Sequence, residues 1–338
     1  MERMNILFIV KEVDYLDPLG LMTISAVARQ QGHQASLCIL NREDVFRKIT
    51  EYKPRIIAYS ASTGEHKYYF QINDRIKAGH KDIFTIMGGP HTTFFPFSIR
   101  ECSLDAVCIG EGEEAFTELL TRMEQGKDIR NIPNILLQGE EQHPELHPIN
   151  QDLDSLPFPD RELIYRNTEM SAFPLKSFMA SRGCPYSCTY CFNHAFRKIY
   201  KNETDFLRRH SVDYMIEEIL QVKKKYNLQF IKFYDDIFIM KVDPWLEEFV
   251  EKYRKKVGLP FHVLMRANLV HEDMVKKLKE AGCHSISISI ESADDRLRNE
   301  VLKRNMTGEQ MLNAFHLCKK YGIHTFANNI LGLPTSTI

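Results

Sequence analysis

The sequence predicts an α/β protein with two successive runs of parallel β/α units. Short apolar runs rich in β-branched residues alternate with amphipathic helical patterns over residues 5–138, and the alternation resumes at residue 176. The segment 139–175 between them is rich in Pro, Asp and Glu and lacks a helical period. Continuous apolar strands between helices are typical of parallel sheets covered on both faces. We therefore expect a doubly wound, Rossmann-like domain at 1–138, a hairpin and linker at 139–175, and a second domain at 176–338.

The first domain is expected to contain five strands and four helices in alternation. Right-handed crossovers would place the carboxyl end of every strand along one edge of the sheet, where such folds bind ligands. The strands are expected at 5–10, 35–40, 55–60, 83–89 and within 104–112, and the helices at 20–33, 43–52, 66–80 and 113–126.

The second domain repeats the alternation and is consistent with a partial, TIM-like (β/α) barrel. Its strands are expected within 176–183, 229–236, 262–268, 284–292 and 324–334. Its helices are expected at about 211–226, 243–257, 271–281 and 294–321, the last broken near Met306-Thr307-Gly308.

Composition excludes several function classes. The chain of 338 residues is 43% hydrophobic and 26% charged, and its net charge of −1 gives no reason to expect nucleic acid as a partner. The apolar run before Lys11 and Glu12 is too short for a signal peptide or a membrane span, so we expect a cytoplasmic protein with no membrane partner. In such a chain, eight cysteines are expected to be metal ligands or buried side chains rather than disulfides.

Polar residues gather at the strand ends of the second domain. Each expected strand finishes in candidate site residues, and the carboxyl rim of a β/α barrel is where active sites lie. Within 284–292 the serines alternate with isoleucines and end in Glu291, which indicates a polar cavity rather than a packed interior. The strand-end residues are Arg182-Gly183-Cys184, Asp235-Asp236, Arg266 and Asn268, Glu291-Ser292, and Gly332.

Three cysteines share one short stretch, "SRGCPYSCTYCFNH", at Cys184, Cys188 and Cys191. Thiolates are soft ligands suited to zinc or to iron–sulfur clusters. His194 would complete a closed Cys₃His zinc site. Without it, one coordination position stays open, and an open position generally indicates chemistry rather than scaffolding.

The chain resembles radical S-adenosylmethionine enzymes that carry a cobalamin-binding domain. The resemblance rests on the Cys184-x-x-x-Cys188-x-Tyr190-Cys191 motif and on segments found in order along the chain. These segments are "DPLGLMTISAVARQQGH", "MGGPHTTFFP", "IGEGEEAFTELL", "LPFPDRELI", "FYDDIF", "SISIESADDRLRNEVLKRNMT" and "NNILGLPT".

For the second domain, the resemblance implies that the three cysteines hold a 4Fe–4S cluster whose open iron chelates S-adenosylmethionine. Tyr190 and Gly332 would lie near the adenine. Asp235 or Asp236 would meet the methionine amino group, since parity alone cannot decide which carboxylate faces inward. Ser289 and Glu291 would face the ribose or methionine portion, and Arg266 or Arg304 would neutralise the carboxylate.

For the first domain, the resemblance implies cobalamin bound over the strand ends. Many cobalamin proteins supply a cobalt-ligating histidine after the first strand, but Asp17 occupies that position here, so we expect no histidine ligand from this loop. For His91, packing or hydrogen bonding is the alternative to an axial-ligand role. The expected cobalamin contacts are Tyr15, Asp17, Pro18, Leu19, Gly20, Ser60, Ser62, Thr63, Gly88, Gly89, Pro90, His91, Gly110, Glu111 and Gly112.

The resemblance implies a radical methyltransferase acting on an unactivated carbon, or phosphorus, of a small-molecule substrate. Flavodoxin or ferredoxin would be the electron donor. A cyclase or rearrangement enzyme without net methyl transfer is the alternative. A third possibility is a non-catalytic cobalamin- or cluster-binding protein, because the chain ends just after the fifth expected strand, where the family continues.

Overall fold

A computed structural model describes residues 3–200 and 205–335 and divides the chain into two compact units. The first comprises residues 1–149 and 156–171, and the second comprises 150–155 and 172–338. The segment expected as hairpin and linker, 139–175, is thus shared between both units. It contains a short helix, α6 (Arg161–Tyr165), which had no helical period in the sequence.

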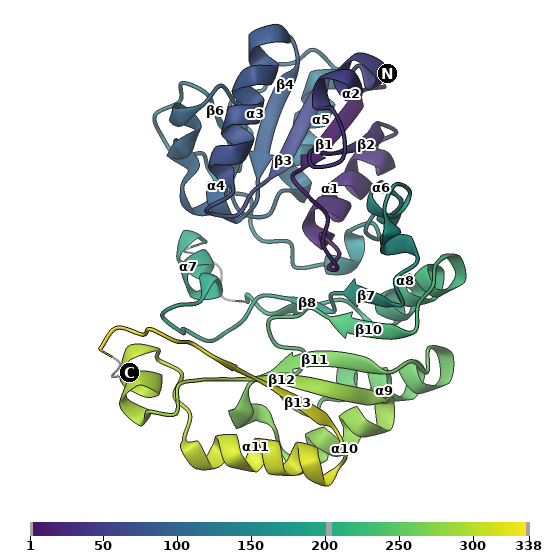
Figure 1. Ribbon diagram of the computed structural model, residues 1–338, viewed down its shortest axis with the longest axis vertical. Helices are drawn as coiled ribbons and strands as arrows, with labels where there is room; N and C mark the ends of the chain where they lie inside the picture. The colour runs from purple at the N-terminus through teal and green to yellow at the C-terminus, as the bar shows by residue number, and fades with distance from the viewer. Residues whose placement is uncertain (1–2, 201–204, 336–338) are drawn as a thin grey trace. The chain divides into compact units, whose positions relative to one another are not determined.

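The first unit is a six-stranded sheet in the order β2-β1-β3-β4-β5-β6, with helices on its faces (Figure 1). Neighbours pair in parallel except β6, which runs antiparallel to β5 and was not predicted. The strands are β1 (Asn5–Val10), β2 (Gln34–Ile39), β3 (Ile56–Ser60), β4 (Phe84–Gly88), β5 (Ala106–Cys108) and β6 (Ile135–Leu137). The helices are α1 (Leu19–Gln30), α2 (Val45–Tyr52), α3 (His66–Gly79), α4 (Pro90–Phe94) and α5 (Glu113–Glu124), together with α6.

Both faces of this sheet are buried. Leu7 and Ile9 of β1 pack into a core with α2 and α3, while the alternate residues Ile6 and Phe8 are also buried. This agrees with the continuous apolar strands from which the doubly wound fold was predicted.

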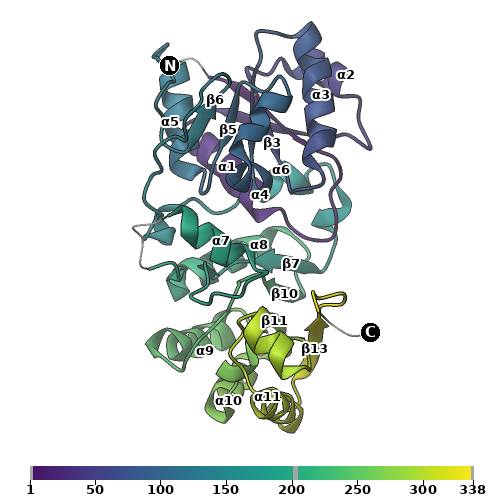
Figure 2. The same ribbon diagram turned by 90° about the vertical axis from the view of Figure 1, so that its left-hand side faces the viewer.

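The second unit is a five-stranded parallel sheet in the order β13-β12-β11-β10-β7 (Figure 1 and Figure 2). Within this sheet, each strand pairs with the next of the five along the chain after a helical crossover, as expected of part of a (β/α) barrel. The strands are β7 (Leu175–Phe178), β10 (Phe230–Phe233), β11 (Phe261–Met265), β12 (Cys283–Glu291) and β13 (His324–Asn329), and a separate antiparallel pair joins β8 (Ser181–Arg182) to β9 (Arg208–Arg209). The helices are α7 (Phe192–Ile199), α8 (Val212–Lys225), α9 (Pro244–Lys256), α10 (Glu272–Ala281) and α11 (Gly308–Lys320).

The expected break in the last helix is confirmed. A π-helical turn covers Leu297–Val301, and α11 begins after the cap Thr307, whose side chain forms a capping box with Gln310. Such π-helical turns are frequent at functional sites.

Gly183 fixes the start of the cysteine loop. It has φ +89°, and a Cβ atom there would lie 1.9 Å from the carbonyl oxygen of Phe206. No side chain fits without moving the backbone. The glycine therefore permits the backbone conformation with which the loop begins after β8.

Gly183→Ala is therefore expected to lower the free energy of unfolding by about 3 kcal/mol or more. Gly322→Ala is the matched control, because Gly322 also has positive φ, +64°, but its nearest atom is a lysine Nζ at 3.8 Å. The control should cost about 1 kcal/mol. Urea denaturation of both variants measures the difference, and equal losses would contradict the steric argument.

Candidate functional site

The three cysteines lie on the loop between β8 and α7. Cys188 is buried, while Cys184 and Cys191 are half-buried, and Cys191 is the N-cap of α7. Burial raises the pKa of the Cys184 thiol to about 11, with Asp236 and the other two thiols contributing. Nearby positive charge, such as that of a metal centre, would be needed to hold Cys184 as a thiolate.

The cysteine loop is fastened to the segment that follows β12. The Thr189 hydroxyl donates to the carbonyl oxygen of Val301 at 2.8 Å, and its backbone N–H donates to that of Leu302 at 3.2 Å. Among the described residues, no three His, Cys, Asp or Glu side chains converge closely enough to hold a metal ion. The residue types nevertheless suit a metal centre that binds sulfur. Three thiols lie on one loop, and Cys188 and Cys191 are near enough to Cys184 to raise its pKa.

Tyr190, Glu291 and Arg304 form one network. The Tyr190 hydroxyl donates to Glu291 Oε1 at 2.9 Å and accepts from Arg304 Nη1 at 2.5 Å. Arg304 Nη1 also lies 3.6 Å from Glu291 Oε1, and Arg304 Nη2 donates to the carbonyl oxygen of Ser289 at 2.7 Å. Both charged side chains are buried. The structure therefore brings together four residues that the sequence had nominated separately.

Arg266 extends this network to the cysteines. Its Nη1 donates to Cys188 Sγ at 3.2 Å, and Nη2 donates to the carbonyl oxygen of Arg304. The guanidinium stacks over the ring of Tyr186, 3.6 Å from its centroid. Arg266 is thus positioned beside a thiol, a contact that sequence reasoning did not anticipate.

The two aspartates after β10 have different surroundings. Asp235 is fully buried, and its oxygens accept from Ser181 Oγ at 2.5 Å and from the Ala180 N–H at 3.2 Å. Asp236 has exposed surface, but the protein around its carboxylate desolvates it and raises its pKa, while hydrogen bonds from Asn193 and the Gly183 N–H favour the charged form. Asp235 ties β10 to the strand before the cysteines, and Asp236 is the carboxylate that remains accessible.

Lack of space for a side chain does not explain the glycine at position 332. It has φ +73°, but an added Cβ would meet no atom within 4 Å. The backbone conformation alone accounts for glycine there.

Sequence reasoning missed Arg298, which organises the segment carrying Arg304. Arg298 is completely buried, and its guanidinium donates to the carbonyl oxygens of Ser292, Ala293 and Met306 at 2.9–3.0 Å and pairs with Asp295. The sequence around it contains several other basic residues, so nothing in the sequence distinguished Arg298 as the buried one.

In the first unit, the expected cobalamin contacts lie at the carboxyl edge of the sheet. Residues 15–20 follow β1, Ser60, Ser62 and Thr63 end or follow β3, residues 88–91 end or follow β4, and residues 110–112 follow β5. Gly89 has φ +97°, and a Cβ there would lie 2.9 Å from the backbone of Ala61. The β3 and β4 loops are therefore in close backbone contact.

Asp17, on the loop from which no histidine ligand was expected, is engaged within the protein. It is buried, its Oδ1 accepts from the Tyr165 hydroxyl at 2.5 Å, and its Oδ2 lies 3.2 Å from Arg161 Nη1. Both partners belong to α6. The carboxylate thus fastens α6 to the loop after β1.

His91 packs against other aromatic rings and keeps one ring nitrogen without a partner in the described part of the chain. It is buried, and its ring stacks on His66 with centroids 3.6 Å apart, while Nδ1 lies 3.2 Å from Thr63 Oγ1. Burial, followed by His66, lowers its pKa, so the imidazole is neutral at pH 7. Its Nε2 is a buried atom with no hydrogen-bond partner among the described residues. This orphaned nitrogen at the carboxyl edge fits a role in contacting a bound group.

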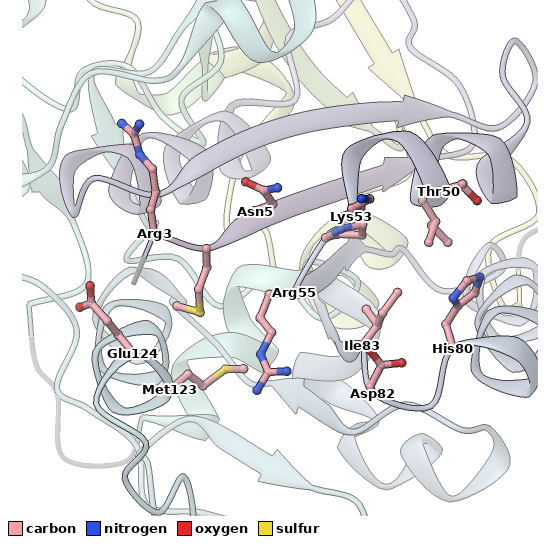
Figure 3. Close-up of a pocket in the computed structure, with 13 residues that line it drawn as sticks. Arg3, Asn5, Thr50, Lys53, Arg55, His80, Asp82, Ile83, Met123 and Glu124 are labelled. Atoms are coloured by element: carbon pink, nitrogen blue, oxygen red, sulfur yellow. The ribbon is translucent and has the colours of Figure 1, made fainter. Parts of the chain in front are cut away.

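A hollow of about 710 Å³ lies at the opposite edge of the first sheet (Figure 3). It is lined near the amino ends of β1, β3 and β4 by residues that include Arg3, Asn5, Lys53, Arg55 and Asp82. None of the candidate cobalamin residues lines it.

Comparison with known proteins gives both halves of the chain a family. Residues 8–120 match the B12 binding domain and residues 179–338 match the Radical SAM superfamily. The chain is therefore a radical S-adenosylmethionine protein that carries a B12-binding domain. No helix in the described ranges combines the length and apolarity that crossing a membrane requires.

Individual relatives agree with this assignment. The chain is 29% identical over 331 residues to an uncharacterized methyltransferase of Pyrococcus horikoshii, covering 95% of this chain and 70% of that protein. It is 27% identical over 312 residues to the anaerobic magnesium-protoporphyrin IX monomethyl ester cyclase of Rubrivivax gelatinosus, covering 88% of this chain and 54% of the cyclase. The fold matches OxsB, a cobalamin-dependent S-adenosylmethionine radical enzyme solved with aqua-cobalamin and S-adenosylmethionine, with TM-score 0.80 and 21% identity over 98% of this chain and 49% of OxsB.

Asp17→Asn is expected to lower the free energy of unfolding by about 3 kcal/mol, because Arg161 loses its buried charged partner. Asp14→Asn, on the exposed part of the same loop, should change it by less than about 0.5 kcal/mol. Denaturant titration compares them, and indistinguishable variants would show that the buried pair has no stabilising role.

Asp235→Asn is expected to alter the pH dependence of stability. Burial raises the pKa of Asp235 to about 7 from 3.8, so between these values the folded state holds a proton that the unfolded state has lost. Wild-type stability should therefore fall as pH rises through this window, and the variant should lose this dependence. Melting temperatures from pH 4 to pH 8 test this, and parallel profiles for both proteins would refute it.

Proposed function

We propose that the protein is a cobalamin-dependent radical S-adenosylmethionine methyltransferase acting on an unactivated carbon, or phosphorus, of a small molecule. The observation that carries the proposal is the fastening of the Cys184–Cys191 loop to the Tyr190–Arg304–Glu291 network at the strand ends. Methyltransferase relatives support the reaction type. The Rubrivivax cyclase keeps a ring closure without net methylation as the second candidate.

In this proposal Cys184, Cys188 and Cys191 hold a 4Fe–4S cluster, and residues 176–338 bind S-adenosylmethionine. When bound, the cluster supplies one electron and cobalamin supplies a methyl group. Asp236, the accessible carboxylate, would receive the methionine amino group, while Asp235 acts only through the backbone that it holds. Tyr190 and Glu291 would border the nucleoside, oriented by Arg304.

Arg266 would place a positive charge against Cys188, one of the three thiols that would hold the cluster. A cation donating to a ligating sulfur favours the electron-rich state and so raises the reduction potential. A flavodoxin or ferredoxin would deliver the electron.

In the first domain, residues 1–138, cobalamin would lie over the carboxyl edge with no histidine ligand from the loop after β1. Asp17 supports this, because it is buried against Arg161 and Tyr165. His91 would contact the cofactor by hydrogen bonding or packing, since its buried Nε2 has no hydrogen-bond partner among the described residues. The chain spans 70% of the length of the Pyrococcus relative and 54% of that of the Rubrivivax cyclase.

The test is anaerobic reconstitution with iron, sulfide and cobalamin, followed by reduction and assay for 5′-deoxyadenosine. Replacing any of the three loop cysteines with alanine should abolish cluster loading and deoxyadenosine formation. Cys102→Ala is the control, because Cys102 is half-buried beside Ile99 in the first unit and should leave both unchanged. Zinc in place of iron, or a cluster retained in Cys188→Ala, would sink the proposal.

Methyl transfer is separated from cyclisation by mass spectrometry of products formed from methyl-deuterated S-adenosylmethionine. A mass increase from the deuterated methyl group is expected in the product. An unlabelled product would favour the cyclase alternative.

A further inference from the structure

The face of the second sheet turned away from its helices is largely polar, although Phe230 and Leu264 also lie on it. On the helix side, Ile231, Phe233, Val263, Ile286 and Ile288 are fully buried in a core with α8 to α11. The residues that alternate with them point the other way. On four adjacent strands, this opposite face carries Ser177, Lys232, His262, Ser285, Ser287 and Ser289.

Lys232, His262 and Ser285 lie side by side across three strands. Lys232 is in register with His262, and His262 with Ser285. The His262 ring nitrogens lie 2.8 Å from Ser285 Oγ and 3.1 Å from Ser287 Oγ. Burial, then Lys232 and His284, lower the pKa of His262 to about 4, so a neutral imidazole holds two hydroxyl groups at pH 7.

Lys232 brings a cation to this row without a counter-charge. It is half-buried, and its Nζ lies 4.6 Å from the ring centroid of Tyr234. No ion pair or hydrogen bond to it occurs among the described residues, and burial is the one cause that lowers its pKa. By contrast, the buried Lys176 on the same sheet donates to the carbonyl oxygen of Phe173 at 2.5 Å. A half-buried cation beside two hydroxyls and an imidazole is a suitable setting for an anion.

We propose that Lys232, His262, Ser285 and Ser287, here called the Lys232 row, bind an anionic group, carboxylate or phosphate, at the far end of the substrate. The inference rests on the proposed function, which places the reacting atom at the strand ends. Ser285 precedes Ser289 by four residues on β12. At about 3.3 Å per residue along the strand, Ser285 lies roughly 13 Å from Ser289, whose carbonyl oxygen accepts from Arg304 in the network at the strand ends. The substrate is therefore elongated, with its anion roughly 13 Å from the reacting centre.

The test is isothermal titration calorimetry of inorganic phosphate and of succinate into the reconstituted protein, with glycerol as the neutral probe. Lys232→Met should weaken anion binding at least about tenfold, while Lys232→Arg, which keeps the charge, should stay within about threefold of wild type. Lys224→Met is the matched control, because Lys224 is exposed on α8, and it should bind as wild type does. The tighter of the two anions identifies the group the row prefers.

Equal phosphate and succinate affinities in Lys232→Met and wild type would overturn the inference, as would an equal loss in Lys224→Met. Thermal melting gives a second measurement that does not depend on the calorimetry. Without anion, Lys232→Met should melt about 2 °C higher, because an uncompensated half-buried cation is removed. A lower melting temperature would mean that Lys232 is structural and would also overturn the inference.

These outcomes are separable from those of the proposed function. If wild type binds phosphate through Lys232 but forms no 5′-deoxyadenosine, the proposed function fails and the anion site stands. If deoxyadenosine forms but no anion binds, only the Lys232 row fails.

Discussion

The contact between Tyr190, Arg304 and Glu291 is the interaction on which the rest of the site depends. The cysteine loop has no regular structure of its own between β8 and α7, so its thiols are placed by what the loop touches. Tyr190 fastens the loop to the end of β12 through Glu291, and Thr189 fastens it to the carbonyl oxygens of Val301 and Leu302. A three-thiol site can leave one position open only if the surrounding chain, rather than a fourth ligand, fixes its geometry.

Buried arginine side chains stabilise the segment that carries this network. Arg298 and Arg304 are both buried, which is costly unless the guanidinium groups are paired or hydrogen-bonded. Arg298 binds three carbonyl oxygens of the segment that bends back from β12. Glu291, Lys303 and Asn305 adopt positive φ around it, a conformation that costs free energy outside glycine. The segment thus uses strained backbone, held by a buried arginine, to present Arg304.

Much of the fold follows from local patterns in the sequence. Continuous apolar strands such as 5–10 and the alternation of 284–292 predicted both parallel sheets, and the helix break near Met306 was also predicted. β6 was not, because a three-residue strand carries too little pattern to reveal its existence or direction. Helix α6 was missed because its five residues are held by Asp17 and Asp160 rather than by periodicity.

The site was predictable as a list of residues but not as a network. Asp235, Asp236, Arg266 and Glu291 were predicted as site residues because they lie at strand ends. Their roles depend on where each side chain points, which the alternation of side chains along a strand does not reveal. A register shift between Ser289 and Glu291 alters the alternation at the point where it matters. Asp235 proved to be fully buried against Ser181, and Arg266 contacts a cysteine. Such long-range partners are set by tertiary packing and leave no local signal.

The central claim is that the fourth coordination position of the cysteine loop belongs to S-adenosylmethionine. Electron-nuclear double resonance of the reduced cluster, recorded with S-adenosylmethionine labelled with ¹⁷O in its carboxylate and ¹⁵N in its amino group, tests this directly. The account predicts hyperfine coupling from both labels, which vanishes when unlabelled S-adenosylmethionine is present in excess. A cluster or metal centre that binds all its ligands from the protein, with no coupling to either label, would contradict it.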